Sequence, residues 1–287
     1  MRGHVARRGT AGLLASVVFL AACGPDSPST TGVAPDAGLS LARAGYHQAG
    51  VHRQYGPPVQ VGNGQARAYV VVDAKHHQAP LELGIALTPG VLDAAGLPTT
   101  QMSYAYLLPL PHFVPAPYQV IELDWNPMGH PPPGIYTFPH FDFHFYTISL
   151  AERNSIVPSN PDFAAEADNL PTGDFVPVPY MPLTGPGLQP HDVAVPQMGV
   201  HWFNPLSPEF NGQPFTQTFI YGSWNGRMTF FEPMITLAYL QTKPNTTTSI
   251  PVPLQYPEAG YFPTAYKVTY DAQAKEYRVA LIDFQKR

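Results

Sequence analysis

The chain has 287 residues, of which 44% are hydrophobic and only 12% are charged, and its formal net charge is −5. An acidic balance argues against nucleic acid as a partner and against electrostatic attachment to a membrane surface. The 35 prolines and 24 glycines are spread between short apolar and aromatic runs. This pattern is typical of strands joined by turns rather than of a disordered chain.

Residues 1–22 are expected to be a signal peptide, because three arginines precede an apolar run that is too short to span a bilayer. The run ends in Leu20-Ala21-Ala22-Cys23, which resembles the lipobox of bacterial lipoproteins. In such proteins the cysteine is lipidated and becomes the first mature residue. An ordinary secretory peptide with an incidental cysteine is the alternative.

We therefore predict lipidation at Cys23 and attachment to a membrane through that anchor, in the bacterial cell envelope. Gly24 resembles the outer-membrane sorting pattern, which favours the periplasmic face of the outer membrane in a Gram-negative cell. Residues 23–45 are small, polar and Pro-containing, and we interpret them as a flexible tether. Cys23 is the only cysteine, so the folded part can hold a metal only through histidines and carboxylates.

Residues 46–287 are expected to form a single β-rich domain. Short apolar and β-branched runs bounded by Pro and Gly predict strands, which lie at 66–72, 80–87, 104–110, 118–123, 175–180, 216–221, 228–240, 265–270 and 277–284. Helices are expected at 89–95 and 160–170. The fold is therefore predicted to be mainly β, an antiparallel sandwich or barrel-like sheets with one or two short helices.

The run from Pro139 to Ser149 alternates aromatic or β-branched residues with His140, Asp142 and His144. In a strand, alternate side chains point to opposite faces. We therefore expect the phenylalanines of this run to face a core and the polar residues to form a row on the other face. Six aromatic residues are expected to belong to the core, namely Phe141, Phe143, Phe145, Trp202, Phe230 and Phe231.

Two further polar residues stand alone among apolar strand formers, His201 and Glu232. A buried carboxylate is unfavourable unless it is paired or coordinated. Four residues are therefore predicted as metal ligands: His140, His144, His201 and Glu232. This set suits zinc, or another divalent transition metal where coordination positions stay open. His130, on a loop stiffened by three prolines, and Asp142 are outer-shell or alternative ligands.

Strand geometry limits that set, because residues four apart in a strand are separated by about 13 Å at their α-carbons. Either a bulge shortens the distance between His140 and His144, or only one of them is a ligand beside Asp142. The ligand types resemble those of cupins, but the cupin spacing is absent. A zinc-protease helix is also absent, since no Glu follows the first His.

Three functions stay open at this point. The first is a lipid-anchored, metal-binding envelope protein, and the second is a metal-dependent hydrolase or cupin-like oxygenase. The third is a structural or assembly protein in which His140, Asp142 and His144 form a polar network without a metal. No nucleotide cofactor is expected, because no Gly-rich phosphate loop follows a strand.

Several motifs are similar to those of a family of uncharacterised bacterial secreted proteins and lipoproteins, a domain of unknown function represented by a Thermus hypothetical protein. The most specific is the block 129–146, with the pattern GHxPPGxYxxPHFDFHFY, and weaker matches lie at 61–67, 125–127, 198–202 and 232–236. The likeness covers most of 55–240. It implies an exported, mainly β domain and is compatible with a homo-oligomer, but it implies no activity.

Overall fold

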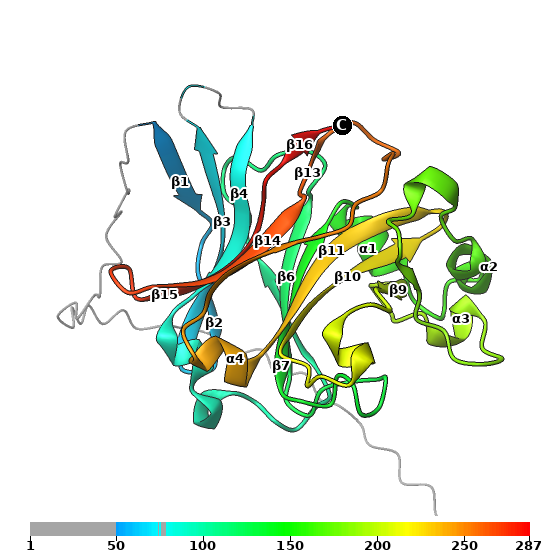
Figure 1. Ribbon diagram of the computed structural model, residues 1–287, viewed down its shortest axis with the longest axis horizontal. Coiled ribbons are helices and arrows are strands. Elements are labelled where there is room, and N and C mark those ends of the chain that lie inside the picture. Colours follow the sequence, from blue (N-terminus) through cyan, green and yellow to red (C-terminus); the bar gives the residue numbers. More distant parts are fainter. Residues whose placement is uncertain (1–49, 74, 76–78) are drawn as a thin grey trace, which may run out of the picture. The chain divides into compact units, whose positions relative to one another are not determined.

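A computed structural model describes residues 50–73, 75 and 79–287, and these residues belong to one compact unit. The predicted signal peptide, Cys23 and tether lie outside the described residues. The unit is built from two seven-stranded antiparallel sheets (Figure 1), which confirms the predicted mainly β fold. None of the helices in the described ranges has the length and hydrophobicity that crossing a bilayer requires.

The first sheet has the strand order β1-β3-β4-β15-β14-β12, with β2 paired to β3. Its strands are β1 (Val51–Tyr55), β2 (Val59–Val61), β3 (Gly64–Asp73), β4 (Pro80–Leu87), β12 (Asn245–Ser249), β14 (Ala265–Asp271) and β15 (Glu276–Ile282).

The second sheet, which carries the candidate site, has the order β5-β6-β7-β11-β10-β9-β8. Its strands are β5 (Tyr104–Leu108), β6 (Val120–Asn126), β7 (His140–Tyr146), β8 (Met181–Pro182), β9 (Val200–Phe203), β10 (Gln217–Trp224) and β11 (Arg227–Thr236). A separate two-stranded pair joins β13 (Tyr261–Phe262) to β16 (Gln285–Lys286).

The helices are short. The α-helices are α1 (Leu150–Ser155), α2 (Phe163–Asp168), α3 (Pro190–Val193) and α4 (Leu237–Gln241), and 3-10 segments lie at Pro89–Leu92, Ala94–Gly96, Gly173–Phe175 and Pro208–Asn211. The helix predicted at 160–170 is α2, whereas the one predicted at 89–95 is a pair of 3-10 turns.

Two predicted strands differ from the observed structure. The segment 175–180 forms turns instead of a strand, and its prolines at 177 and 179 lack the N–H that a sheet ladder needs. The strand predicted at 228–240 ends at Thr236. There the Thr236 side chain accepts a hydrogen bond from the Tyr239 backbone N–H and caps α4, so the last residues turn into a helix.

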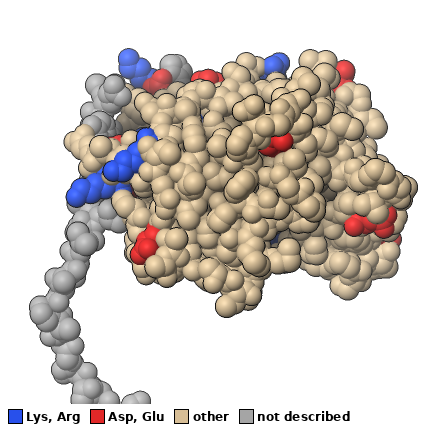
Figure 2. Space-filling view, turned by 60° about the horizontal axis from the view of Figure 1, so that its bottom comes forward, with Lys and Arg blue, Asp and Glu red and all other residues tan. Residues whose placement is uncertain are grey.

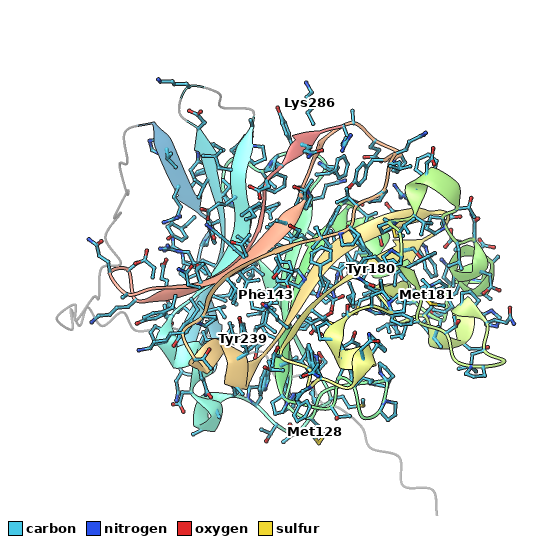
Figure 3. The ribbon with its side chains drawn as sticks, viewed as in Figure 1. Met128, Phe143, Tyr180, Met181, Tyr239 and Lys286 are labelled. Atoms are coloured by element: carbon cyan, nitrogen blue, oxygen red, sulfur yellow. The ribbon has the colours of Figure 1, made fainter. Side chains whose placement is uncertain are left out.

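The main core lies between the two sheets, where the side chains fill the space (Figure 3). Strand β7 contributes Phe141, Phe143 and Phe145, all fully buried as predicted. Burying one such ring contributes about 1.5–3 kcal/mol relative to leaving it exposed. Phe231 also joins this core, but Phe230 packs in a second apolar cluster with Tyr146 and Trp224. Phe230 is therefore buried in a core cluster as predicted, but on the opposite face of the sheet from Phe231, because neighbouring residues in a strand face opposite sides.

Few Lys, Arg, Asp or Glu side chains lie on the face seen in Figure 2. This sparse distribution agrees with the low share of charged residues in the whole chain, 12%.

Candidate metal centre

The outer face of the second sheet carries a buried grid of polar side chains. On β7 these are His140, Asp142 and His144, which alternate with the core phenylalanines as predicted. Strand β6 places one polar residue opposite each of them, in the pairs Asn126–His140, Asp124–Asp142 and Glu122–His144. On the other side, the register of β11 places Glu232 opposite His144. Each of these seven residues is at most 4% exposed.

His130, His140 and Asp142 form one group, here called the Asp142 group, in which the three ligand atoms lie within 4.8 Å of one another. The Nε2 atom of His140 is 3.1 Å from Asp142 Oδ1, and the Nε2 atom of His130 is 3.5 Å from Asp142 Oδ2. Asn126 Nδ2 donates a hydrogen bond of 2.6 Å to Asp142 Oδ2. His130 reaches this group from the Pro-rich loop between β6 and β7.

His144, His201 and Glu232 form the second group, here called the Glu232 group, again with ligand atoms within 4.8 Å of one another. Glu232 Oε2 is 3.3 Å from His144 Nε2 and 3.7 Å from His201 Nε2. His201 comes from β9, where it pairs with Gly222 of β10. The Phe230 ring packs against both imidazoles, at centroid distances of 5.0 Å from His144 and 5.5 Å from His201.

A third possible ligand set combines two acids of β6 with His144. Asp124 Oδ2 is 3.6 Å from His144 Nδ1, and Glu122, Asp124 and His144 together also satisfy the spacing of a metal site. Glu122 forms a buried ion pair with Arg153 of α1. The carboxylates of Asp124, Asp142 and Glu232 have ion pairs only with histidines in the part of the chain that the structure describes.

The structure therefore divides the four ligands that the sequence suggested. His144, His201 and Glu232 converge, whereas His140 lies with Asp142 and His130, the two residues expected to be outer-shell or alternative ligands. The pairing of β6 with β7 has no register shift, so the bulge that would have shortened the distance between His140 and His144 is absent from β7.

Sequence reasoning missed the contribution of β6. Val120 to Asn126 alternates apolar residues with Glu122, Asp124 and Asn126, and this period of two was a signal for a second polar row. The row could have been found, but its position beside β7 depends on a pairing across a loop. No pattern in the sequence around Arg153 indicated that this residue would pair with Glu122.

Many polar atoms of these groups are buried without a hydrogen bond. Among the described residues they are both carboxylate oxygens of Asp124, His140 Nε2, Asp142 Oδ1, both ring nitrogens of His144, and Glu232 Oε2. Each buried polar group left unsatisfied costs about 1–3 kcal/mol. Two of the atom pairs, His140 with Asp142 and His144 with Glu232, are within hydrogen-bonding distance. Since neither pair is a hydrogen bond, their atoms are not aimed at each other.

Burial and the charges of neighbouring side chains shift the pKa values of these carboxyl groups and imidazoles in different directions. Burial raises the pKa of Asp124 well above its usual value, although the charge of His144 opposes this, and burial likewise raises the pKa of Glu232. Burial lowers the pKa of His201 to about 3, helped by His144 and His130. Burial also lowers the pKa of His144, but the Glu232 and Asp124 charges outweigh it and raise the pKa to about 10.

In the Asp142 group the carboxylate stays ionised. Burial opposes the charge of Asp142, but the neighbouring charges of His140 and His130 hold its pKa well below the ordinary range. Burial lowers the pKa of His130 as well, and the interaction with Asp142 outweighs this effect and raises the pKa to about 9. A cation bound in the grid would therefore take the place of the protons that His130 and His144 hold.

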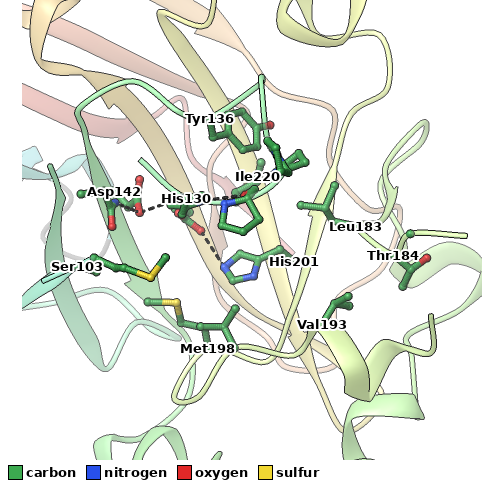
Figure 4. A pocket seen from close by; sticks show the side chains of 18 of the residues that line it. Ser103, His130, Tyr136, Asp142, Leu183, Thr184, Val193, Met198, His201 and Ile220 are labelled. Carbon is green, nitrogen blue, oxygen red and sulfur yellow. Dashed lines mark hydrogen bonds and ion pairs between the residues drawn. The ribbon is translucent and has the colours of Figure 1, made fainter. Parts of the chain in front are cut away.

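Both groups open onto one cavity of about 670 Å³. His130, Asp142 and His201 lie close together at its floor, with the ion pairs drawn in Figure 4. The walls are mostly apolar and include Met102, Pro131, Pro132, Pro133, Tyr136, Leu183, Leu188, Val193, Val195, Met198 and Ile220. A cavity of this size with an apolar wall and a few convergent polar groups has the form of a small-molecule site.

Comparison with known proteins does not assign this arrangement. No family model, no curated protein and no solved structure matches the chain. The function is therefore argued from the residues and their geometry.

Proposed function

We propose that the protein binds a divalent transition metal, zinc foremost, through His144, His201 and Glu232. The observation that supports this most is the convergence of three ligand atoms that have no hydrogen-bond partner among themselves. Two ligands about 2.1 Å from a tetrahedral zinc ion lie about 3.4 Å apart. The separations of 3.3 and 3.7 Å in the Glu232 group are close to that value.

The surroundings of His144 also fit a ligand. A metal-binding histidine usually has a carboxylate or carbonyl at its other ring nitrogen, which orients the ring and raises its basicity. Asp124 occupies that position at 3.6 Å. Three protein ligands leave a coordination position open, and the partly exposed His201 lies on the side that faces the cavity.

A metal-dependent enzyme, a hydrolase or a cupin-like oxygenase, is the second candidate. The cavity beside a three-ligand set favours it, because structural zinc sites are normally closed by four protein ligands. A bound ion would supply Lewis acidity or an activated water. The residues of the cavity would bind and orient the substrate, and the apolar walls favour a substrate with an apolar body.

A structural network without a metal is the third candidate. It requires the buried atoms to satisfy one another, and seven of the polar atoms named above lack a partner within the described ranges. We therefore place it below both metal-binding candidates.

We further propose that the protein is exported and anchored to a bacterial envelope membrane by lipid at Cys23, as the lipobox-like sequence suggests. Metabolic labelling with a radioactive fatty acid tests this. Label should enter the wild type and be absent from Cys23→Ser, and equal labelling of both proteins would contradict the anchor.

Elemental analysis of protein purified without a histidine tag tests the metal proposal. We expect at least about one ion per chain in the wild type and a loss in His144→Ala and in Glu232→Gln. His191→Ala is the matched control, because His191 also has a carboxylate partner, Asp168 at 2.8 Å, but lies partly exposed on α3, outside both groups. Less than about 0.2 ion per chain in zinc-supplemented wild type, unchanged in the variants, would overturn the proposal.

A further inference from the structure

We infer that the Asp142 group is a second metal site, so that the protein binds two divalent ions on the floor of one cavity. This goes beyond the proposed function, which requires only the Glu232 group. The two groups share no ligand, and each can therefore be occupied or lost by itself.

The first argument is the orientation of His140. Its Nδ1 atom lies 2.7 Å from the backbone carbonyl oxygen of Phe138. A carbonyl oxygen only accepts hydrogen bonds, so Nδ1 carries the proton and donates it. In the neutral ring, Nε2 then holds a lone pair, and this lone pair is on the side of Asp142. Metal-binding histidines commonly donate their other N–H to a carbonyl in this manner.

His130 repeats the arrangement at the other carboxylate oxygen of Asp142. Its Nδ1 atom lies 2.8 Å from the carbonyl oxygen of Pro131, and its Nε2 atom is 3.5 Å from Asp142 Oδ2. Two imidazoles from different segments of the chain thus present the same nitrogen to one carboxylate. Their rings meet edge to face with centroids 4.7 Å apart.

The contacts within the group are not those of an ordinary ion pair. His140 Nε2 and Asp142 Oδ1 are fully buried and 3.1 Å apart, yet neither has a hydrogen-bond partner within the described residues. A protonated imidazole held for a salt bridge would aim its N–H at the oxygen. Atoms that lie close together but are not aimed at each other are arranged as ligands around a third point.

The distances agree with such a point. The two N–O separations, 3.1 and 3.5 Å, are on either side of the roughly 3.4 Å expected between two ligands of a tetrahedral zinc ion. Asn126 donates to Asp142 Oδ2 at 2.6 Å and so fixes the carboxylate plane. Oriented ligands with outer-shell hydrogen bonds are what a metal site requires.

The two groups adjoin. Asp142 and His144 are successive outward-facing residues of β7, about 6.6 Å apart at their α-carbons. His130, Asp142, His201 and Glu232 all line the same cavity. Two ions held in this way would face one ligand, which favours a molecule that offers at least two oxygen donors.

Zinc stoichiometry separates the two sites. The full chain, purified without a histidine tag, is saturated with zinc, dialysed and analysed for metal. We expect about two ions in the wild type and about one in His140→Ala and in His201→Ala. The double variant should hold close to none, and His191→Ala should match the wild type. Asp142→Asn, which keeps the size of the side chain, should behave as His140→Ala does and decides the case if His140→Ala fails to fold.

The outcomes distinguish the two ideas. One ion in the wild type, lost in His201→Ala and retained in His140→Ala and Asp142→Asn, would overturn the second site and leave the Glu232 site in place. One ion lost in His140→Ala and retained in His201→Ala would support the Asp142 site and refute the Glu232 site. No bound zinc in the wild type would overturn both.

Discussion

Zinc should stabilise the fold, and His201→Ala should remove the part of that effect that comes from the Glu232 group. The structure suggests this variant because His201 is the ligand nearest the sheet edge, and its side chain is 16% exposed. Its removal leaves the core between the sheets intact. It loses mainly the contact with the Phe230 ring, so the metal-free variant should unfold within a few degrees of the metal-free wild type.

The size of the effect follows from linkage. At free zinc roughly 100 times the dissociation constant, binding adds about 2.7 kcal/mol to the free energy of unfolding. For a unit of this size, each kcal/mol raises Tm by about 2–4 °C, so binding at the Glu232 group should contribute about 5–11 °C to the wild-type shift. If loss of the ligand weakens binding at the Glu232 group about 100-fold, the same zinc concentration adds only about 0.4 kcal/mol through that group, or about 1–2 °C.

Thermal unfolding followed by circular dichroism, with and without zinc and after EDTA, measures both shifts. His191→Ala should keep the full wild-type shift, since it lies outside both groups. The reasoning would be refuted if zinc raised Tm equally in His201→Ala and in the wild type. It would also be refuted if zinc left the wild type unchanged.

Four further predictions concern the fold and the chemistry of the site. Phe143→Ala should lower the free energy of unfolding by about 3–5 kcal/mol in urea titrations. The control Phe138→Ala should change it by less than about 0.5 kcal/mol, because Phe138 is 48% exposed; similar losses in both variants would contradict the core assignment of Phe143. Arg153→Met should lower the free energy of unfolding by about 3–5 kcal/mol, because it leaves Glu122 buried without its partner. Adding Glu122→Gln should restore much of that free energy, and no recovery would show that the lost ion pair is not the cause. Gly222→Ala should weaken zinc binding in calorimetry, since the new methyl group would overlap the Phe230 ring that packs on His144 and His201; unchanged affinity would show that this ring does not position the ligands. Zinc affinity should fall steadily as the pH is lowered from about 9, because the Glu232 and Asp124 charges raise the pKa of His144 to about 10 and zinc has to displace that proton. A constant affinity between about pH 8.5 and about pH 6 would argue against His144 as a ligand.

Local patterns predicted the two faces of β7, because a period of two is a property of a single strand. They placed the phenylalanines in the core and the histidines on the other face of the sheet. They also marked His201 and Glu232 as isolated polar residues among apolar strand formers. The same rule, applied to adjacent residues, places Phe230 on the opposite face of the sheet from Phe231, where it is buried in the second apolar cluster.

The grouping of the ligands could not be obtained in this way. It depends on which strands become neighbours, and Asp124 and Asp142 meet only because β6 pairs with β7 across the Pro-rich loop. That loop also carries His130 over the strand to Asp142. Both arrangements are tertiary, and no spacing within one segment encodes them.

The proposed ligands extend from His130 to Glu232 and come from three strands and a loop. An unfolded chain has no such site, so metal loading has to follow folding. If the chain is exported before it folds, the compartment beyond the inner membrane and its supply of free ions would determine which metal the protein acquires.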